Sequence, residues 1–354
     1  MDVYQILEQA VKRQVSDILI TAGLPLTYKI KGQMQREGEA RLSPEDTQNL
    51  IAQIYELAQN RSMNTVLLNG DDDFSFSLPA LSRFRVNTLK QRSSLAAVIR
   101  VVPFGLPNYQ ELFIPEAVMR FADYKKGLLL VTGPAGCGKS TTLACLIDKI
   151  NNNRSGHIIT IEDPIEYLHQ HRSSVVTQRE LSIDTQSYTT ALRAALRQAP
   201  NVILLGEMRD AETIRVAITA AETGHLVIST LHTIGAAHTI DRIIDSFPPA
   251  QQQQVRLQLA MSLQGVVSQQ LIPAVGGGVI PAFEVMVVNN AIRNLIRESK
   301  AHQIETVIYS SAGEGMITMD TSLYNLAKEG KISQENAVLY SLQSEQMQKK
   351  LALG

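Results

Sequence analysis

Residues 127–141 read GLLLVTGPAGCGKST, which joins a short apolar strand to a glycine-rich loop and the start of a helix over 141–150. The loop has the spacing G-x-x-x-x-G-K-S. Its glycines allow backbone N–H groups to approach phosphate oxygens, and the helix N-terminus adds the positive end of its dipole. A strand before the loop and a helix after it distinguish a phosphate-binding loop from a glycine turn that happens to hold a lysine. The stretch therefore predicts an α/β nucleotide-binding domain.

Each part of this loop has an expected role toward ATP. Lys139 is expected to reach the β- and γ-phosphates, and the hydroxyl of Ser140 is expected to bind Mg²⁺. The predicted nucleotide-binding residues are Gly133, Pro134, Ala135, Gly136, Cys137, Gly138, Lys139, Ser140 and Thr141.

Four short apolar runs alternate with helical stretches, at 127–132, 157–162, 202–205 and 226–231. This alternation predicts a parallel sheet covered by helices, in which ligands bind beyond the carboxyl ends of the strands.

The run 157–162 ends in Glu162 and is followed by Asp163, two carboxylates suited to orienting a water or to holding Mg²⁺ through water. The alternative is a turn or helix cap, for which Asp-Pro is a common signature.

The run 202–205 is followed by Gly206 and Glu207, with glycine where a strand of this kind usually supplies an aspartate directed at Mg²⁺. Glu207 is therefore a candidate for polarising the attacking water. The alternative is an acid at a strand end that pairs with Arg209 or Arg215.

His225 and His232 flank the run 226–231. Seven residues of strand extend over roughly 23 Å, so the two imidazoles are not expected to share a metal ion. His232 is placed to sense the γ-phosphate, whereas a structural role is favoured for His225.

The rest of the chain predicts further domains. Residues 1–102 indicate a small α+β domain, with apolar residues at helical spacing over 3–15, a capped helix over 43–58, and strands at 18–21, 26–30, 74–78, 83–89 and 96–102. A linker is predicted at 103–114, where two prolines and a glycine interrupt regular structure. An ATPase domain follows over 115–289, with an antiparallel extension at 266–272 and 279–288, and a helical region covers 290–354.

The composition argues against several classes of protein. The 354 residues contain 33 Lys and Arg against 34 Asp and Glu, which argues against a nucleic-acid partner. Cys137 and Cys145 are too few for a disulfide framework and form no zinc pair, so reduced thiols and no structural zinc are expected. No apolar run reaches the roughly 18 residues of a membrane-spanning helix. The sequence thus predicts a cytoplasmic protein.

In order, the four segments resemble the Walker A loop, aspartate box, Walker B strand and histidine box of the type II and type IV secretion and pilus motor ATPases. These boxes cover 127–245, and the resemblance extends over the whole chain. The stretch AIRNLIRE at 291–298 is similar in all eight positions to the C-terminal signature of the pilus retraction motors in this family. In the loop, Ala135 and Cys137 occupy positions where this family more commonly has threonine and serine.

The resemblance implies a PAS-like N-terminal domain, a RecA-like ATPase domain and C-terminal helices. It also implies a homo-hexamer that binds ATP and Mg²⁺ between subunits and acts on an inner-membrane pilus platform protein, on the cytoplasmic face at the pilus base. The catalytic residues would be Glu207, Glu162, His232 and Lys139, and the Mg²⁺ residues would be Ser140 and Asp163. Candidate arginines that reach the phosphates from the N-terminal sheet are Arg83, Arg85, Arg92 and Arg100.

The function implied is ATP-driven pilus retraction, and hence twitching motility. The alternatives are a pilus-assembly or type II secretion ATPase, whose members are larger and often bind zinc, a RecA-like nucleic-acid translocase, and a nucleotide-switched scaffold.

The residues of this octapeptide predict a helix even without the family resemblance. An apolar face is formed by Ile292, Leu295 and Ile296, while Arg293 and Arg297 repel each other mildly at i, i+4 and are expected to meet an acidic surface. The alternative is a solvated basic face. The motor-coupling residues implied by the resemblance are Ala291, Ile292, Arg293, Asn294, Leu295, Ile296, Arg297 and Glu298.

Overall fold

A computed structural model describes residues 2–30, 32–59, 61–79, 81–102 and 105–353. The chain divides into two compact units, the first comprising Met1–Gly105 with Glu166–Leu168 and the second Leu106–Ile165 with His169–Gly354. Of the predicted linker, Pro103 and Phe104 lie outside the described residues.

The first unit is an antiparallel sheet with three helices. Its strand order is β3-β2-β1-β6-β5-β4. The strands are β1 (Asp17–Ile20), β2 (Thr27–Ile30), β3 (Gln33–Arg36), β4 (Asp71–Leu78), β5 (Ser82–Gln91) and β6 (Ser94–Val102), and the helices are α1 (Val3–Lys12), α2 (Pro44–Ala58) and α3 (Asn64–Asn69).

Local sequence explains the helix that starts most sharply in this unit. The side chain of Ser43 accepts from the backbone N–H of Asp46, and the Asp46 carboxylate accepts from the backbone N–H of Ser43, so a capping box precedes α2. The apolar faces of α1 and α2 share a core with the sheet. Two elements had no sequence signal: β3 is exposed throughout, and α3 has only six residues.

The second unit contains a seven-stranded sheet in the order β13-β12-β7-β11-β10-β8-β9. Its strands are β7 (Gly127–Thr132), β8 (His157–Glu162), β9 (Val175–Glu180), β10 (Val202–Leu205), β11 (Leu226–Leu231), β12 (Leu263–Pro273) and β13 (Val279–Val287). All neighbours pair in parallel except β12 and β13, which form an antiparallel hairpin. The α/β class with a mostly parallel sheet is therefore confirmed.

Helices cover both faces of this sheet, because alternate residues of each strand point to opposite sides. Leu129 and Val131 of β7 pack with α5, while Leu128 and Leu130 face the core formed by α6 to α11. The helical elements are α4 (Glu116–Met119), η1 (Arg120–Asp123), α5 (Lys139–Asn153), α6 (Tyr188–Ala195), α7 (Ala211–Glu222), α8 (Ala236–Asp245), α9 (Pro249–Ser262), α10 (Asn290–Arg297), η2 (Ala301–Gln303), α11 (Ile304–Ser310), η3 (Ala312–Glu314), α12 (Met319–Lys328), α13 (Gln334–Tyr340) and α14 (Ser344–Leu353).

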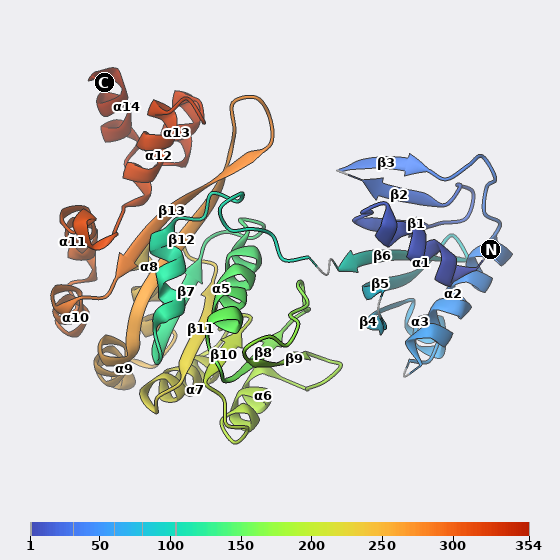
Figure 1. The fold of residues 1–354 in the computed structure, drawn as a ribbon, viewed down its shortest axis with the longest axis horizontal. Coiled ribbons are helices and arrows are strands. Elements are labelled where there is room, and N and C mark those ends of the chain that lie inside the picture. The colour runs from blue at the N-terminus through green and yellow to red at the C-terminus, as the bar shows by residue number, and fades with distance from the viewer. Residues whose placement is uncertain (1, 31, 60, 80, 103–104, 354) are drawn as a thin grey trace. The chain divides into compact units, whose positions relative to one another are not determined.

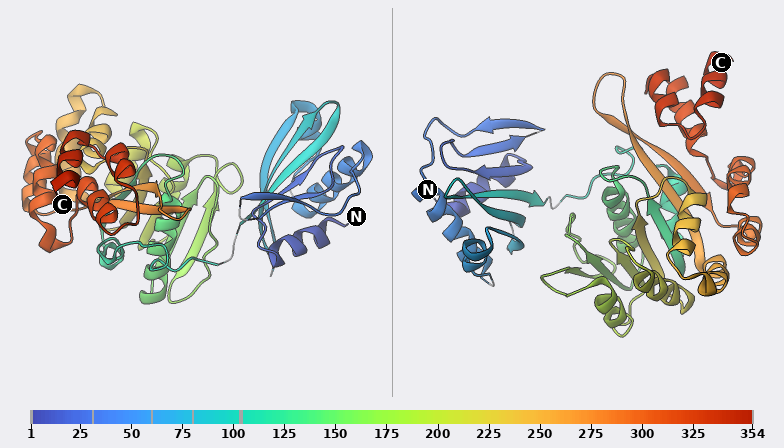
Figure 2. Two further views of the ribbon diagram at one scale, coloured as in Figure 1. Left: turned by 90° about the horizontal axis from the view of Figure 1, so that it is seen from above. Right: turned by 180° about the vertical axis from the view of Figure 1, so that it is seen from behind.

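The last three helices pack on the β12–β13 hairpin, beside which they lie in Figures 1 and 2. Ile272 and Ile280 of the hairpin share a small core with Met319 and Leu323 of α12. Among the described residues, no helix combines the length and the apolar character needed to span a membrane.

Candidate active site

The sheet register brings the four predicted segments to one edge. In β7, Thr132 lies opposite Leu231 of β11, and in β10, Leu205 lies opposite Ile161 of β8. The residues that follow these strand ends are the glycine loop, the pair Glu162 and Asp163, Glu207, and His232. Parallel strands end at a common edge, so these segments meet where open sheets of this type bind ligands.

The glycine loop wraps around the ammonium group of Lys139. Lys139 is 9% exposed, and its Nζ donates to the carbonyl oxygens of Gly133 at 2.8 Å and Pro134 at 2.9 Å. Gly136 and Gly138 have φ values of 76° and 88°, a backbone conformation that other residues rarely adopt. The loop is thus held open at the N-terminus of α5, with a cation at its centre.

Gln269 on β12 holds the glycine loop through two hydrogen bonds, a role that was not predicted from the sequence. Its Nε2 donates to the carbonyl of Cys137, and its Oε1 accepts from the Thr142 hydroxyl, both at 2.7 Å. The approach is so close that a side chain at Gly133 would collide with the Gln269 carbonyl. The available signal was the polar run Ser268, Gln269 and Gln270, which lies between apolar residues of the same strand.

Glu207 lies at the centre of a charged cluster. Arg209 forms an ion pair with Glu207 Oε1, and its Nη2 lies 3.7 Å from Asp163 Oδ2. On the other side, His232 Nε2 is 3.3 Å from Glu207 Oε2. The structure therefore contains the Glu207–Arg209 pair named as an alternative above, and places His232 against the same carboxylate.

The cluster keeps Glu207 ionised at neutral pH. Burial acts to raise the pKa of this carboxyl group, but the hydrogen bond and charge of Arg209, together with His232, outweigh burial and lower the pKa below its ordinary value. Arg215, the other candidate partner, instead bonds Gln251 and lies over the ring of Phe247.

Packing at Gly206 explains why glycine replaces the usual aspartate. A Cβ there would lie 2.8 Å from the hydroxyl oxygen of Tyr188 and 3.2 Å from the carbonyl oxygen of Ile161. Burial raises the pKa of Tyr188, and the nearby charges of Asp163 and Glu207 raise it further. Tyr188 thus remains a neutral hydroxyl beside the acidic residues, a position that nothing in the sequence indicated.

Glu162 points into a polar group on β8 and β9. Its Oε1 accepts from the Thr160 hydroxyl at 2.6 Å and from Gln178 Nε2 at 3.3 Å.

His225 lies at the end of β11 opposite to His232, where its Nδ1 is 3.0 Å from the carbonyl oxygen of Ala220. The two histidines therefore belong to opposite edges of the sheet.

The side chains of Ser140 and Asp163 carry oxygen atoms, the ligand type that Mg²⁺ prefers. Ser140 follows Lys139 at the start of α5, and Asp163 ends the neighbouring acidic segment. Among the described residues no group of three or more His, Cys, Asp or Glu side chains is arranged for a metal ion. Mg²⁺ takes one or two protein oxygens and completes its shell with phosphate and water, so such a group is not required.

In the N-terminal unit, the four candidate arginines differ in their own contacts. Arg85 pairs with Asp73 at 2.9 Å, Arg100 donates to Asp17 at 3.1 Å, and Arg83 donates to a serine hydroxyl at 3.2 Å. Arg92 lies exposed in the turn between β5 and β6.

The octapeptide forms α10, and its two arginines separate. Arg293 Nη1 donates to the carbonyl oxygens of Ala260 at 2.5 Å and Met261 at 3.2 Å, and so caps the C-terminal end of α9. This partner is the negative end of a helix rather than the acidic surface expected from the sequence. Arg297 is exposed and reaches only Asn294 among the described residues.

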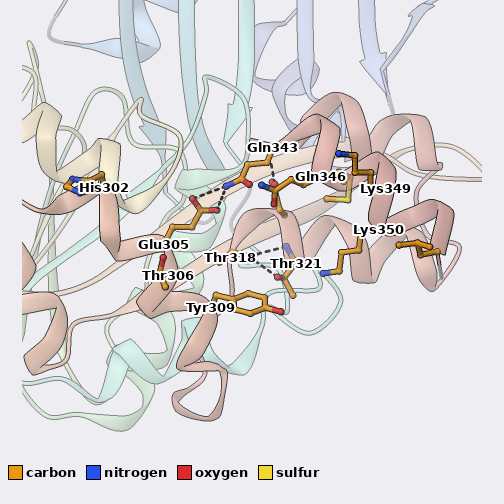
Figure 3. A pocket seen from close by; sticks show the side chains of 13 residues that line it. His302, Glu305, Thr306, Tyr309, Thr318, Thr321, Gln343, Gln346, Lys349 and Lys350 are labelled. Atoms are coloured by element: carbon orange, nitrogen blue, oxygen red, sulfur yellow. Dashed lines mark hydrogen bonds between the residues drawn. The ribbon is translucent and has the colours of Figure 1, made fainter.

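A separate pocket of about 810 Å³ lies among the C-terminal helices (Figure 3). Glu305 and Tyr309 of α11 line one side and Lys349 of α14 another, and Glu305 accepts from Gln343 Nε2 at 3.3 Å. No residue of the glycine loop lines it, so it is distinct from the site described above.

Comparison with known proteins gives matches over most of the chain. The family model described as "Type II/IV secretion system protein" matches residues 1–277. The type IV pilus retractation ATPase PilT of Pseudomonas aeruginosa is 45% identical, over 91% of this chain and 93% of its own. A twitching motility protein of Neisseria gonorrhoeae is 46% identical, over 83% of this chain and 78% of its own. The crystal structure of the pilus retraction motor PilT with bound ADP superposes with a TM-score of 0.90, at 45% identity and 99% coverage of both chains.

Proposed function

We propose, on the premise that the chain belongs to the type II/IV secretion system protein family, that it hydrolyses ATP to retract a type IV pilus and thereby supports twitching motility. The premise follows from the family match over residues 1–277, and the chain is accordingly a nucleotide-binding ATPase of that family. The observation that supports retraction is the similarity to a retraction motor over 99% of both chains, C-terminal helices included.

The proposed mechanism assigns binding to the loop and hydrolysis to the charged cluster. The backbone N–H groups of the loop and the Lys139 ammonium hold the β- and γ-phosphates, where they stabilise the charge of the transferring phosphoryl group. Glu207, kept ionised by Arg209 and His232, accepts a hydrogen bond from the attacking water and orients it. Glu162 and Asp163 add negative charge at the same edge and help to hold that water and Mg²⁺.

Mg²⁺ would be held by the Ser140 hydroxyl and, through water, by Asp163. When bound, the ion neutralises charge between the phosphates. The ion pair between Arg209 and Asp163 is exposed enough to exchange with solvent, since the Arg209 side chain is 62% exposed.

Completion of the site is assigned to a second subunit. In a homo-hexamer, an arginine of one N-terminal unit would reach the phosphates held by another subunit and stabilise transition-state charge. Arg92 is the favoured candidate because, within the described residues, no hydrogen bond or ion pair of this side chain is present, whereas Arg85 and Arg100 already pair with aspartates. The motor would act at the cytoplasmic face on an inner-membrane platform protein, without nucleic acid or zinc.

Deletion of the gene is expected to leave cells with long, persistent pili and no twitching, because assembly would continue without retraction. Labelled pili followed by live-cell fluorescence microscopy measure this directly. Cells that lack pili altogether would point to an assembly motor, and cells with unchanged pili would contradict both functions.

Arg297 is expected to couple hydrolysis to movement. Arg297→Ala should leave the ATPase rate within about twofold of wild type, because this side chain is exposed and bonds only Asn294 among the described residues, yet the change should stop pilus retraction. Arg242→Ala on α8, also an exposed arginine, is the matched control and should retract normally. Arg293→Ala should instead lower the melting temperature, since it removes the cap of α9. Normal retraction in the Arg297 variant would remove this coupling role.

A further inference from the structure

The helix that follows the histidine segment begins without a cap of its own. α8 starts at Ala236, and its N-cap is Gly235, which has no side chain to accept from the first N–H groups. Such groups have no partner within the helix and need one from elsewhere. Here the β12–β13 hairpin supplies the acceptors: Ser268 Oγ accepts from Gly235 N at 2.9 Å, and Glu284 Oε1 accepts from Ala236 N at 2.6 Å.

The second oxygen of Glu284 reaches another helix. Glu284 Oε2 accepts from the backbone N–H of Met319 at 3.3 Å, and Met319 is the first residue of α12. One carboxyl group therefore lies between the N-termini of two helices, where the positive ends of both dipoles favour negative charge. Within the described residues, its hydrogen-bond partners are these two N–H groups.

Burial makes this arrangement specific. Glu284 is 3% exposed on a strand whose neighbouring residues are apolar. Burial raises the pKa of its carboxyl group, which the two N–H bonds partly oppose. Leaving a buried polar group without its partners is costly, so both helix starts are held at fixed positions relative to β13.

The residues beside Glu284 connect it to the nucleotide site. Ser268 lies directly opposite Glu284 in the antiparallel register, and the next residue of β12, Gln269, holds the glycine loop through Cys137. His232 precedes Ala236 by four residues of chain. On the far side, α12 opens the C-terminal helices, and Thr318 and Thr321 at its start line the pocket of Figure 3.

We propose that Glu284 is a positioning residue that fixes the histidine segment 232–236 and the start of α12 as one body. Through Ala236 it holds His232 against Glu207, and through Met319 it ties that position to the C-terminal helices. The inference rests on the proposed function, because it takes His232 as a contributor to hydrolysis.

Glu284→Gln tests the first half of this proposal. Glutamine keeps one acceptor but places an NH₂ group against the other backbone N–H, so kcat for ATP hydrolysis should fall about tenfold with the KM for ATP unchanged. In a double-mutant cycle, the same change should have little further effect on a His232→Gln enzyme, since both act through His232. Ser268→Ala, which removes only the Gly235 bond, should show a smaller but equally non-additive loss. If Glu284→Gln does not fold, the cycle of Ser268→Ala with His232→Gln is the deciding test.

Asp320→Asn is the matched control. Its carboxylate accepts from Leu342 N at 2.7 Å and Gln343 N at 3.0 Å, so it ties the start of α12 to the segment before α14 without reaching the histidine segment. This variant should keep wild-type kcat. A Glu284→Gln enzyme with the kcat of the control, or losses that multiply in the cycle, would overturn the proposal. A His232→Gln enzyme with full kcat would overturn the role of His232 and the proposal with it, and a wild type without ATPase activity would overturn the proposed function itself.

Hydrogen exchange tests the second half. Adding a non-hydrolysable ATP analogue to the full-length protein should change the exchange of the amides in the first turn of α12 in wild type, and this change should disappear in Glu284→Gln. A merely structural cap would not carry the nucleotide response. An unchanged α12 in wild type, or a response that persists in the variant, would contradict the link.

Discussion

Glu207→Gln is expected to lower kcat for ATP hydrolysis by about 100- to 10,000-fold, the range that a positioned general base contributes. The amide keeps the shape of the side chain but cannot accept the proton of the attacking water. It also loses the charge that attracts Arg209 and His232. ATP binding should remain, because the loop and Lys139 are untouched. Phosphate release at saturating ATP, together with the affinity for a fluorescent ATP analogue, measures the two effects separately.

Asp210→Asn provides the control for this variant. Asp210 lies three residues further along the same segment and caps α7 by accepting from Thr213 N at 2.8 Å. Asparagine caps a helix about as well as aspartate, so the folding of α7 and the hydrolysis rate should both be retained. A Glu207→Gln enzyme as fast as this control would move the water-orienting role to another residue. Equal, near-zero rates in wild type and variant would instead indicate a nucleotide-switched scaffold.

Four of the parallel strands were predictable because each is built around consecutive apolar residues. β7, β8, β10 and β11 have the bounds expected from the sequence, since their apolar residues are buried on both faces of the sheet. β9 was missed for the opposite reason. Its sequence VVTQRE has only two apolar residues at its start, and it lies at the edge of the sheet.

The partners of charged residues were less predictable, because tertiary packing selects them. The sequence left Arg209 and Arg215 as equal alternatives for Glu207, and the turn after β10 decides between them by directing Arg209 to the carboxylate. Glu284 bonds segments 48 and 35 residues away, a distance over which local patterns carry no information. Only its presence in an apolar strand signalled a buried polar role.

The two arginines of the octapeptide illustrate the same limit. Helical periodicity correctly placed Ile292 and Ile296 in the core. It gave no means of separating Arg293 from Arg297, since both lie on one face at i, i+4. The neighbouring helix separates them: the end of α9 offers carbonyl oxygens to Arg293 alone.

Lys139→Ala is expected to reduce ATP affinity by at least about tenfold and to abolish measurable hydrolysis, because a hydrogen bond to a charged group contributes about 1.5–3 kcal/mol and Lys139 is expected to donate to the phosphates. Both ATP binding and hydrolysis should be impaired, whereas Glu207→Gln should impair hydrolysis alone. Without the ammonium group, the carbonyl oxygens of Gly133 and Pro134 also lose their donor. Isothermal titration with ATP and Mg²⁺ measures the affinity, and the melting temperature without nucleotide reports on the loop.

Lys149→Ala separates this effect from a general loss of positive charge on α5. Lys149 lies ten residues further along the same helix and pairs with Glu116 at 2.9 Å, away from the loop. Its removal changes the net charge of the chain by the same amount, so ATP affinity should stay at the wild-type value. If Lys139→Ala binds ATP as tightly as Lys149→Ala, the phosphates lie elsewhere and the assignment of the glycine loop is wrong. If both variants lose affinity equally, long-range attraction rather than contact with the phosphates explains the effect, an outcome that raising the salt concentration would expose, since screening weakens such attraction.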